Sequence, residues 1–142
     1  MARAIDTYRG AVFPWECDHN GHMNVRFYVA KFDEGTWQFM AAIGLSRAEQ
    51  RRRNLGAMAV NQTIAYKREL LAGDVVAVAT DVTRIGGSSV TFRHRMTDAA
   101  SGEAVAEMEI VGVFVDLAAR KSTPIPDDVR ARAAALMAEV AA

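Results

Sequence analysis

Residues 25–43 carry the longest periodic pattern of the sequence, which predicts one long helix. Its apolar side chains recur at roughly helical spacing: Tyr28, Phe32, Phe39 and Ile43. A helix with one buried face has this pattern. Asn24 is suited to cap the first turn, and Gly44 to end the helix in a left-handed conformation. Gly35 weakens a helix interior by about 1 kcal/mol relative to Ala, so we expect it where the helix packs closely against a sheet.

Strand character occurs once before this helix and four times after it. The segments are residues 7–15, 58–67, 74–84, 88–97 and 103–116. They are β-branched, aromatic or alternating, and Gly-containing turns separate the last four, which we interpret as an antiparallel meander. In the segment 88–97, one face carries Val90, Phe92, His94 and Met96, which predicts a buried side and a wet side. A final helix is expected from Asp127 to about Val140, with acids at its positive end.

The composition fits one soluble domain. The chain has 142 residues, of which 51% are hydrophobic and 24% charged, enough for one substantial core. Lys plus Arg equals Asp plus Glu at 17 each, so no overall field steers the protein to nucleic acid or an anionic membrane. Cys17 has no partner for an internal disulfide, and no signal peptide or membrane span is visible. We expect a single cytoplasmic domain over residues 1–142, with neither nucleic acid nor membrane as partner.

Five strands and one long helix favour a two-layer α+β fold, with the helix against one face of the sheet. Six strand residues are predicted to line the helix side: Val76, Val78, Val82, Met108, Ile110 and Phe114. The opposite face then needs water or a partner.

The loop before the helix concentrates the polar side chains. In acyl transfer, negative charge develops on a carbonyl oxygen, and the N–H groups at a helix start can stabilise that charge. A carboxylate beside them supplies a base or a nucleophile. Asp18 is therefore the candidate catalytic residue, and the N–H groups of residues 24–27 are the candidate oxyanion donors. His22 is a candidate base or substrate-orienting group. The alternative is that Asp18 only stabilises the turn and His22 only binds the loop backbone.

This loop also contains the residue types of two other kinds of site, a metal site and a thiol nucleophile. His19 and His22, with Glu16 and Asp18, offer metal-ligand types, but their spacing matches no zinc-protease signature. We expect neither a metal nor another cofactor. Cys17 lies between two acids, which oppose formation of a thiolate, so a buried inert cysteine is expected.

Several side chains outside the loop have two interpretations. Four are expected in the core and could instead line an acyl pocket: Phe32, Trp37, Phe39 and Met40. Three polar residues at the start of the second strand could face such a pocket or simply lie on an outer face: Asn61, Gln62 and Thr63. His94 is expected to be a hydrogen-bonded core histidine.

The run V-F-P-W-E-C-D-H-N-G-H-M-N-V-R-F-Y, continued by Phe32-Asp33-Glu34, resembles the hotdog-fold acyl-CoA thioesterases related to 4-hydroxybenzoyl-CoA thioesterase. The likeness extends through Tyr66, Gly73-Asp74, residues 85–89 and residues 120–126, and so covers most of the chain. It implies a hotdog fold, in which a five-stranded antiparallel sheet wraps around one long helix. It also implies dimers that pair through their sheets, often as tetramers, with active sites at the subunit interface.

The resemblance also implies roles for individual residues. Asp18 matches the catalytic carboxylate, acting as nucleophile or as general base, and the backbone N–H of Val25 matches the oxyanion donor. The candidates for substrate binding are Asn24, Trp37, Asn61, Thr63, Ser88 and Ser89. The enzyme that hydrolyses 4-hydroxybenzoyl-CoA has a basic cluster for the nucleotide phosphates before its fourth strand, where this chain has residues 85–88. Possible substitutes are Arg84, Arg93, Arg120 and Lys121.

We therefore expect hydrolysis of an acyl-CoA thioester by a homodimer or homotetramer. One alternative is a hotdog module that binds acyl-CoA without catalysis. Another is a hotdog dehydratase acting on a 3-hydroxyacyl chain, although the loop lacks the histidine spacing of that family.

Overall fold

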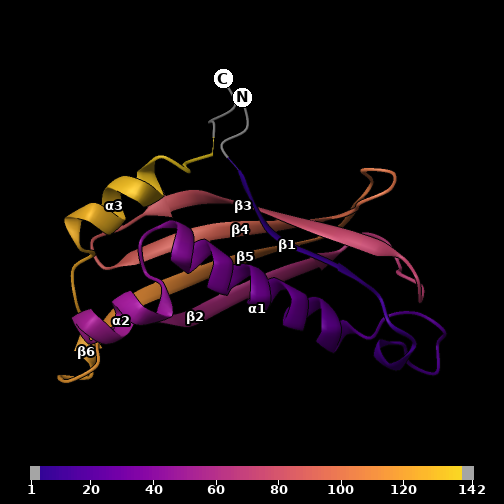
Figure 1. The fold of residues 1–142 in the computed structure, drawn as a ribbon, viewed down its shortest axis with the longest axis horizontal. Helices are drawn as coiled ribbons and strands as arrows, with labels where there is room; N and C mark the ends of the chain where they lie inside the picture. Colours follow the sequence, from indigo (N-terminus) through magenta and orange to yellow (C-terminus); the bar gives the residue numbers. More distant parts are fainter. Residues whose placement is uncertain (1–3, 139–142) are drawn as a thin grey trace.

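The computed structural model describes residues 4–138 and places one long helix in the hollow of a curled antiparallel sheet (Figure 1). The strands are β1 (Ile5–Ala11), β2 (Leu55–Tyr66), β3 (Val75–Ile85), β4 (Ser89–Asp98), β5 (Ala104–Asp116) and the short β6 (Lys121–Ser122). The helices are η1 (Pro14–Glu16), α1 (Val25–Ala42), α2 (Arg47–Arg53) and α3 (Asp127–Ala134). The predicted α+β class is confirmed. None of the helices in the described range is long and apolar enough to cross a membrane.

The strand order differs from the predicted meander. The sheet runs β1-β3-β4-β5-β2, with every pair antiparallel and β6 beside β5. The meander prediction holds for β3, β4 and β5, but it is wrong for β2, which pairs with β5 at the edge of the sheet. Alternation along a segment reports which side chains share a face, but it does not report which strand lies alongside.

Two predicted boundaries are also wrong. The first strand ends at Ala11 instead of Trp15, because residues 14–16 turn into the short helix η1 and the Glu16 carboxylate accepts the Phe13 N–H at 2.8 Å. The last helix ends at Ala134. The chain then runs along β3, where the Ala138 N–H donates to the Val82 carbonyl oxygen at 2.7 Å. The predicted end at Val140 lies outside the described residues.

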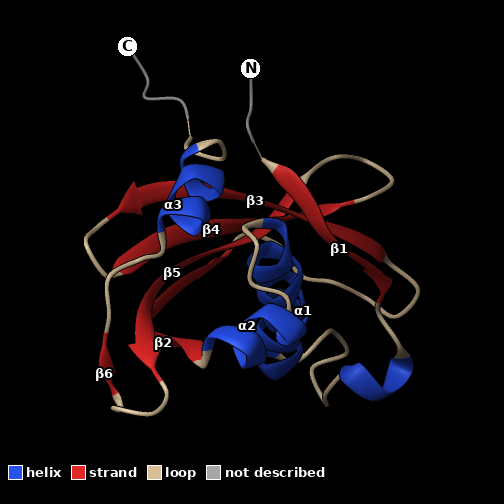
Figure 2. Ribbon diagram, turned by 60° about the vertical axis from the view of Figure 1, so that its left-hand side comes forward, coloured by secondary structure: helices blue, strands red, loops and turns tan. Residues whose placement is uncertain are grey.

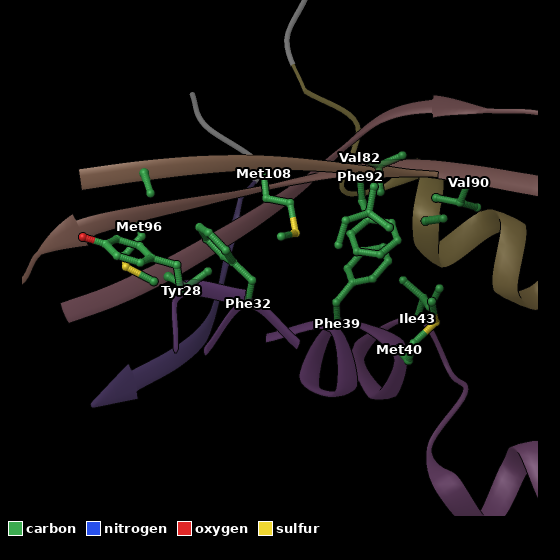
Figure 3. Close-up of a cluster of buried hydrophobic side chains, with 14 of the residues drawn as sticks. Tyr28, Phe32, Phe39, Met40, Ile43, Val82, Val90, Phe92, Met96 and Met108 are labelled. Carbon is green, nitrogen blue, oxygen red and sulfur yellow. The ribbon is translucent and has the colours of Figure 1, made fainter. Parts of the chain in front are cut away.

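Helix α1 begins and ends as predicted and covers the apolar face of the sheet. The Asn24 side chain accepts the Arg26 N–H at 3.0 Å, and Gly44 has a φ of +94°. The apolar residues of the helix pack on buried residues of the sheet, as Figure 3 shows for Phe39 and Phe92. All six strand residues predicted to face the helix are buried.

Gly35 permits the close approach of α1 to the sheet. A Cβ at this position would lie 3.1 Å from Thr7 Oγ1 and 3.3 Å from His94 Cε1. The prediction of tight packing at Gly35 is confirmed. Figure 2 shows the sheet curling around α1, with α2 beside β2 and α3 beside β3.

Candidate active site

The loop between η1 and α1 is closed by its own backbone hydrogen bonds. The Asp18 N–H donates to the His22 carbonyl oxygen at 3.1 Å, and the Asn24 N–H donates to the Glu16 carbonyl oxygen at 2.9 Å. Gly21 makes the turn with a φ of +86°, a conformation that glycine adopts without steric cost. These contacts hold Asp18 next to the first turn of α1.

The Asp18 carboxylate is held by two donors. Its Oδ1 accepts the Asn20 N–H at 2.9 Å, and its Oδ2 accepts the Asn24 side-chain amide at 2.9 Å. These bonds, with that from Asn24 the larger, lower the pKa of Asp18, so the group is ionised at neutral pH. The Asn24 oxygen is already used by the Arg26 N–H, which fixes the amide with its NH₂ toward Asp18.

The first N–H of α1 is free to bind a ligand. Val25 is the first residue of the helix, and its N–H donates to no acceptor within the described residues. The Val25 side chain is 55% exposed. An unpaired N–H at the positive end of a helix is a site for negative charge. Asp18 and Val25 thus place an ionised carboxylate and an unpaired helix N–H in one short segment.

His22 lies close to Glu69, which follows β2 in the chain. Its Nε2 is 3.6 Å from Glu69 Oε1, and the ring helps to line a cleft with Val25, Tyr28 and Tyr66. The predicted role of His22 beside Asp18 stays a prediction.

A buried ion pair holds the start of this loop against helix α1. Lys31 Nζ lies 3.1 Å from Glu16 Oε2, and Glu16 Oε1 accepts the Phe13 N–H at 2.8 Å. This pair ties η1 to the second turn of α1. Sequence reasoning missed it, although a lysine on the same helix face as Tyr28 and Phe32 is a signal, because a buried ammonium needs a carboxylate partner.

A pocket of about 170 Å³ opens between α1 and the sheet, further along the helix. Phe32 and Phe39 are fully buried, so their core prediction is confirmed. Trp37 is 57% exposed and lines the pocket together with Met40. The expectation that Trp37 belongs to the core is therefore wrong, and its alternative as a pocket residue fits. Gln62 of β2 also lines this pocket.

The other predicted substrate-binding residues lie away from the Asp18 loop. Asn61 and Thr63 are exposed in the middle of β2, not at its start, and they do not line the pocket. Ser88 and Ser89 lie where β3 joins β4, at the opposite end of the sheet from Asp18 (Figure 1). Strand β3 has 11 residues, which corresponds to about 35 Å. One chain alone does not bring these four residues to Asp18.

The remaining candidates are settled by their surroundings. Cys17 is half-buried with its Sγ 3.9 Å from the Phe13 carbonyl oxygen, so it is less buried than expected. His94 is fully buried and contacts the hydroxyls of Thr80 at 2.6 Å and Thr36 at 2.9 Å, which confirms a hydrogen-bonded core histidine. Burial lowers the pKa of His94 to about 4. Within residues 4–138, no three His, Cys, Asp or Glu side chains converge as metal ligands.

Comparisons with known proteins agree with this architecture. The sequence model of the thioesterase-like superfamily matches residues 12–133. A betainyl-CoA thioesterase from Pseudomonas aeruginosa is 28% identical over 136 residues, which covers 96% of this chain and 86% of that protein. The long-chain acyl-CoA thioesterase FadM from Escherichia coli is 23% identical over 113 residues, which covers 77% of this chain and 82% of that protein.

A solved structure shows the same fold over almost the whole length. It is a Staphylococcus aureus protein determined in complex with CoA, and it superposes with a TM-score of 0.88 at 19% identity, covering 99% of this chain and 90% of the other. At this identity the likeness establishes the fold alone. The family match spans most of the sequence, and this chain therefore belongs to the thioesterase-like superfamily, with its hotdog fold.

Proposed function

We propose that this protein hydrolyses acyl-CoA thioesters, with Asp18 and the Val25 N–H as its catalytic groups. Membership of the superfamily and the named activities of two relatives support the reaction class. The mechanism rests on one observation at the start of α1. An ionised carboxylate, held by two hydrogen bonds, lies beside an unpaired N–H at a helix N-terminus.

The two groups act on different atoms: the Val25 N–H on the carbonyl oxygen, and Asp18 on the carbonyl carbon or on the attacking water. The thioester carbonyl oxygen accepts the Val25 N–H, and the helix N-terminus stabilises the negative charge that develops on it. Asp18 either attacks the carbonyl carbon directly or removes a proton from an attacking water. In either route the C–S bond breaks, the sulfur leaves as the CoA thiolate and takes up a proton, and water supplies the oxygen of the free acid.

The proposal includes a homo-oligomer whose active site lies at a subunit interface. Strand β2 pairs with β5 on one side only, and Val60 on this edge strand is largely exposed. Long exposed edges are surfaces on which another strand can pair. We also expect a cytoplasmic location, where the free thiol of Cys17 stays reduced.

Substitution of Asp18 tests the catalytic assignment. Asp18→Asn and Asp18→Ala should lower CoA release at least about 100-fold, the usual range for loss of a catalytic acid or base. The melting temperature should stay near that of the wild type, because Asp18 is a half-buried loop residue outside the hydrophobic core. Asp6→Asn, an exposed strand residue outside the loop, is the matched control and should keep full activity.

The outcomes also separate the alternative functions. A folded Asp18→Ala enzyme with wild-type turnover would overturn the assignment. Wild-type protein that binds acyl-CoA but releases no thiol is a binding module. Dehydration of a 3-hydroxyacyl-CoA without thiol release would indicate a dehydratase.

A further inference from the structure

The pocket between α1 and the sheet lies on the helix that carries the proposed oxyanion donor. Val25 and Asp33 are about two turns apart, or about 12 Å, and Trp37 lies about 18 Å from Val25. Val29, which is partly exposed, comes between Val25 and Asp33 at a spacing of four residues, so the three side chains point to a similar side of the helix. One strip of α1 therefore leads from the reacting carbonyl to the pocket.

The pocket is mostly apolar. Its floor is formed by Phe92, Ile110 and Gly112 of the sheet, and Met40 and Met58 are among the residues of its walls. Asp33 is the only ionisable side chain among the described residues that line it. Asp33 is also the lining residue of α1 nearest to Val25 along the chain. An apolar tail suits most of this lining, an acyl group with a distal carboxylate is repelled by Asp33, and a distal cation would be attracted to it.

The dimensions of the pocket limit the acyl group that can use it. Its volume is about 170 Å³, and an apolar cavity of about 150 Å³ accommodates a benzene molecule. The pocket therefore has room for roughly six carbons. With the thioester carbonyl at Val25, the acyl chain must first extend over about two turns of α1. Acetyl and propionyl groups are too short to reach it.

Gly112 lies in the pocket floor and has no side chain, so it leaves space for a ligand. It lies on the inward face of β5 between Ile110 and Phe114. Its φ is not in the left-handed region, so its backbone does not require glycine. A Cβ at this position would lie 3.6 Å from Phe92 Cε1 and 3.8 Å from the Val90 carbonyl oxygen. These are ordinary contacts, so alanine fits, and a longer side chain must extend into the pocket.

We infer that this pocket takes the far end of an uncharged acyl chain of medium or greater length, and that Gly112 sets its depth. This inference rests on the proposed thioesterase function. The two relatives are named for very different acyl groups, betainyl and long-chain. The distance of the pocket from Val25, about 12 Å along α1, favours the second kind, because a betainyl group is too short to reach it.

The test is CoA release from straight-chain acyl-CoAs between acetyl and palmitoyl, with betainyl-CoA as a short cationic substrate. For the wild type, kcat/KM should rise once the tail reaches the pocket. Gly112→Leu should lower kcat/KM at the preferred length at least about tenfold, the effect of losing one or more methylene contacts in an apolar pocket. The loss for acetyl-CoA, which is too short to reach the pocket, should be much smaller than the loss at the preferred length. Gly112→Ala should have a smaller effect in the same direction.

Two further variants keep the test decisive. Val111→Leu places the same leucine side chain next to Gly112 but on the opposite face of β5 and should leave the chain-length profile unchanged. Met58→Ala removes an exposed wall residue and should extend the preference to longer chains. If Gly112→Leu does not fold, as judged by its melting temperature, Gly112→Ala and Met58→Ala decide the outcome.

The possible failures are distinguishable. No CoA release by the wild type from any acyl-CoA would overturn the proposed function itself. Hydrolysis with a flat chain-length profile, or with betainyl-CoA preferred over the longer chains, would overturn only the pocket inference. An equal loss for all chain lengths in folded Gly112→Leu protein would also overturn it, as would unchanged profiles in Gly112→Ala and Met58→Ala.

Discussion

Asn24 joins the two halves of the proposed catalytic unit. Its side-chain oxygen caps α1 at the Arg26 N–H, and its NH₂ group donates to Asp18. Both ends of the side chain are thus engaged within the protein, although the sequence suggested a role in substrate binding. We infer that Asn24 positions Asp18 relative to the Val25 N–H and helps to keep the carboxylate ionised.

Replacement of Asn24 should move the pH profile of the enzyme. Its hydrogen bond is the main cause of the lowered pKa of Asp18, followed by the Asn20 N–H, with smaller contributions from His19 and His22. A base must be ionised, so activity is lost as the pH falls through the pKa of Asp18. Asn24→Ala should raise this pKa and shift the acid limb of kcat/KM to higher pH. Loss of the helix cap should also lower the free energy of unfolding by about 1 kcal/mol.

Asn24→Asp separates the two effects. Aspartate is a favoured N-cap, but it places a second carboxylate beside Asp18, and like charge raises a carboxyl pKa. The acid limb of kcat/KM should therefore shift to higher pH while the helix stays capped. An acid limb that stays in place for Asn24→Ala, measured alongside urea unfolding, would contradict the positioning role.

Individual site residues could be predicted from the sequence where their contacts lie within a few residues along the chain. Asp18 and Val25 belong to one short segment, whose turn and cap chemistry can be read directly. Trp37 was misplaced because helical periodicity gives the direction of a side chain but not whether a strand covers that direction. Lys31 was missed because its partner Glu16 lies in a different element.

At the level of elements, His94 of β4 ties three strands and α1 together. Thr36 of α1 donates to the Phe32 carbonyl oxygen at 3.2 Å, so its contact with His94 requires the hydrogen on Nε2. Nδ1 then accepts the hydroxyl of Thr80, which lies 2.8 Å from the Thr7 hydroxyl of β1. The neutral imidazole is satisfied in this arrangement, and burial of the ring disfavours its charged form.

This network should make the fold sensitive to acid. The pKa of His94 is about 4 in the fold and about 6.5 in an unfolded chain. Between these values the unfolded state binds a proton that the folded state does not, so stability falls as the pH falls from about 6.5 to 4. The full loss corresponds to roughly 3 kcal/mol. His94→Gln keeps a donor and an acceptor but does not titrate, and its free energy of unfolding should depend less on pH in this window. Parallel curves for the two proteins, measured by urea unfolding, would contradict this account.

The strands were predictable as elements, whereas the order of β2 in the sheet was not. Each strand has a local signature of alternation, and the turns between β3, β4 and β5 are short enough to make them neighbours. The connection from β2 to β3 instead crosses the molecule, and β2 pairs with β5 over a register from Leu55 with Asp116 to Tyr66 with Ala106. This pairing depends on contacts far apart in sequence, which no local pattern encodes.

For the whole molecule, two features favour a site that is completed by a second copy of the chain. They are the free edge of β2 and the distance of several predicted site residues from Asp18. The edge is twelve residues long and exposes apolar side chains, with Val60 61% exposed. Asn61, Thr63, Ser88 and Ser89 do not approach Asp18 within one chain. If any of them contacts substrate near Asp18, it does so from a second copy, and a chain on its own then carries an incomplete site.

Disruption of the β2 edge should therefore reduce both assembly and activity. The wild type should have the mass of a dimer or a larger oligomer by light scattering. Val60→Lys places a charge on the exposed edge, where charged side chains oppose strand pairing, and should give a folded monomer with reduced CoA release. Val75→Lys replaces another exposed valine, 48% exposed at the start of β3, and should leave the mass unchanged. A monomeric wild type with full turnover would contradict the interface proposal. A Val60→Lys monomer that retains full turnover would instead show that Asp18, Val25 and their own chain form a complete site.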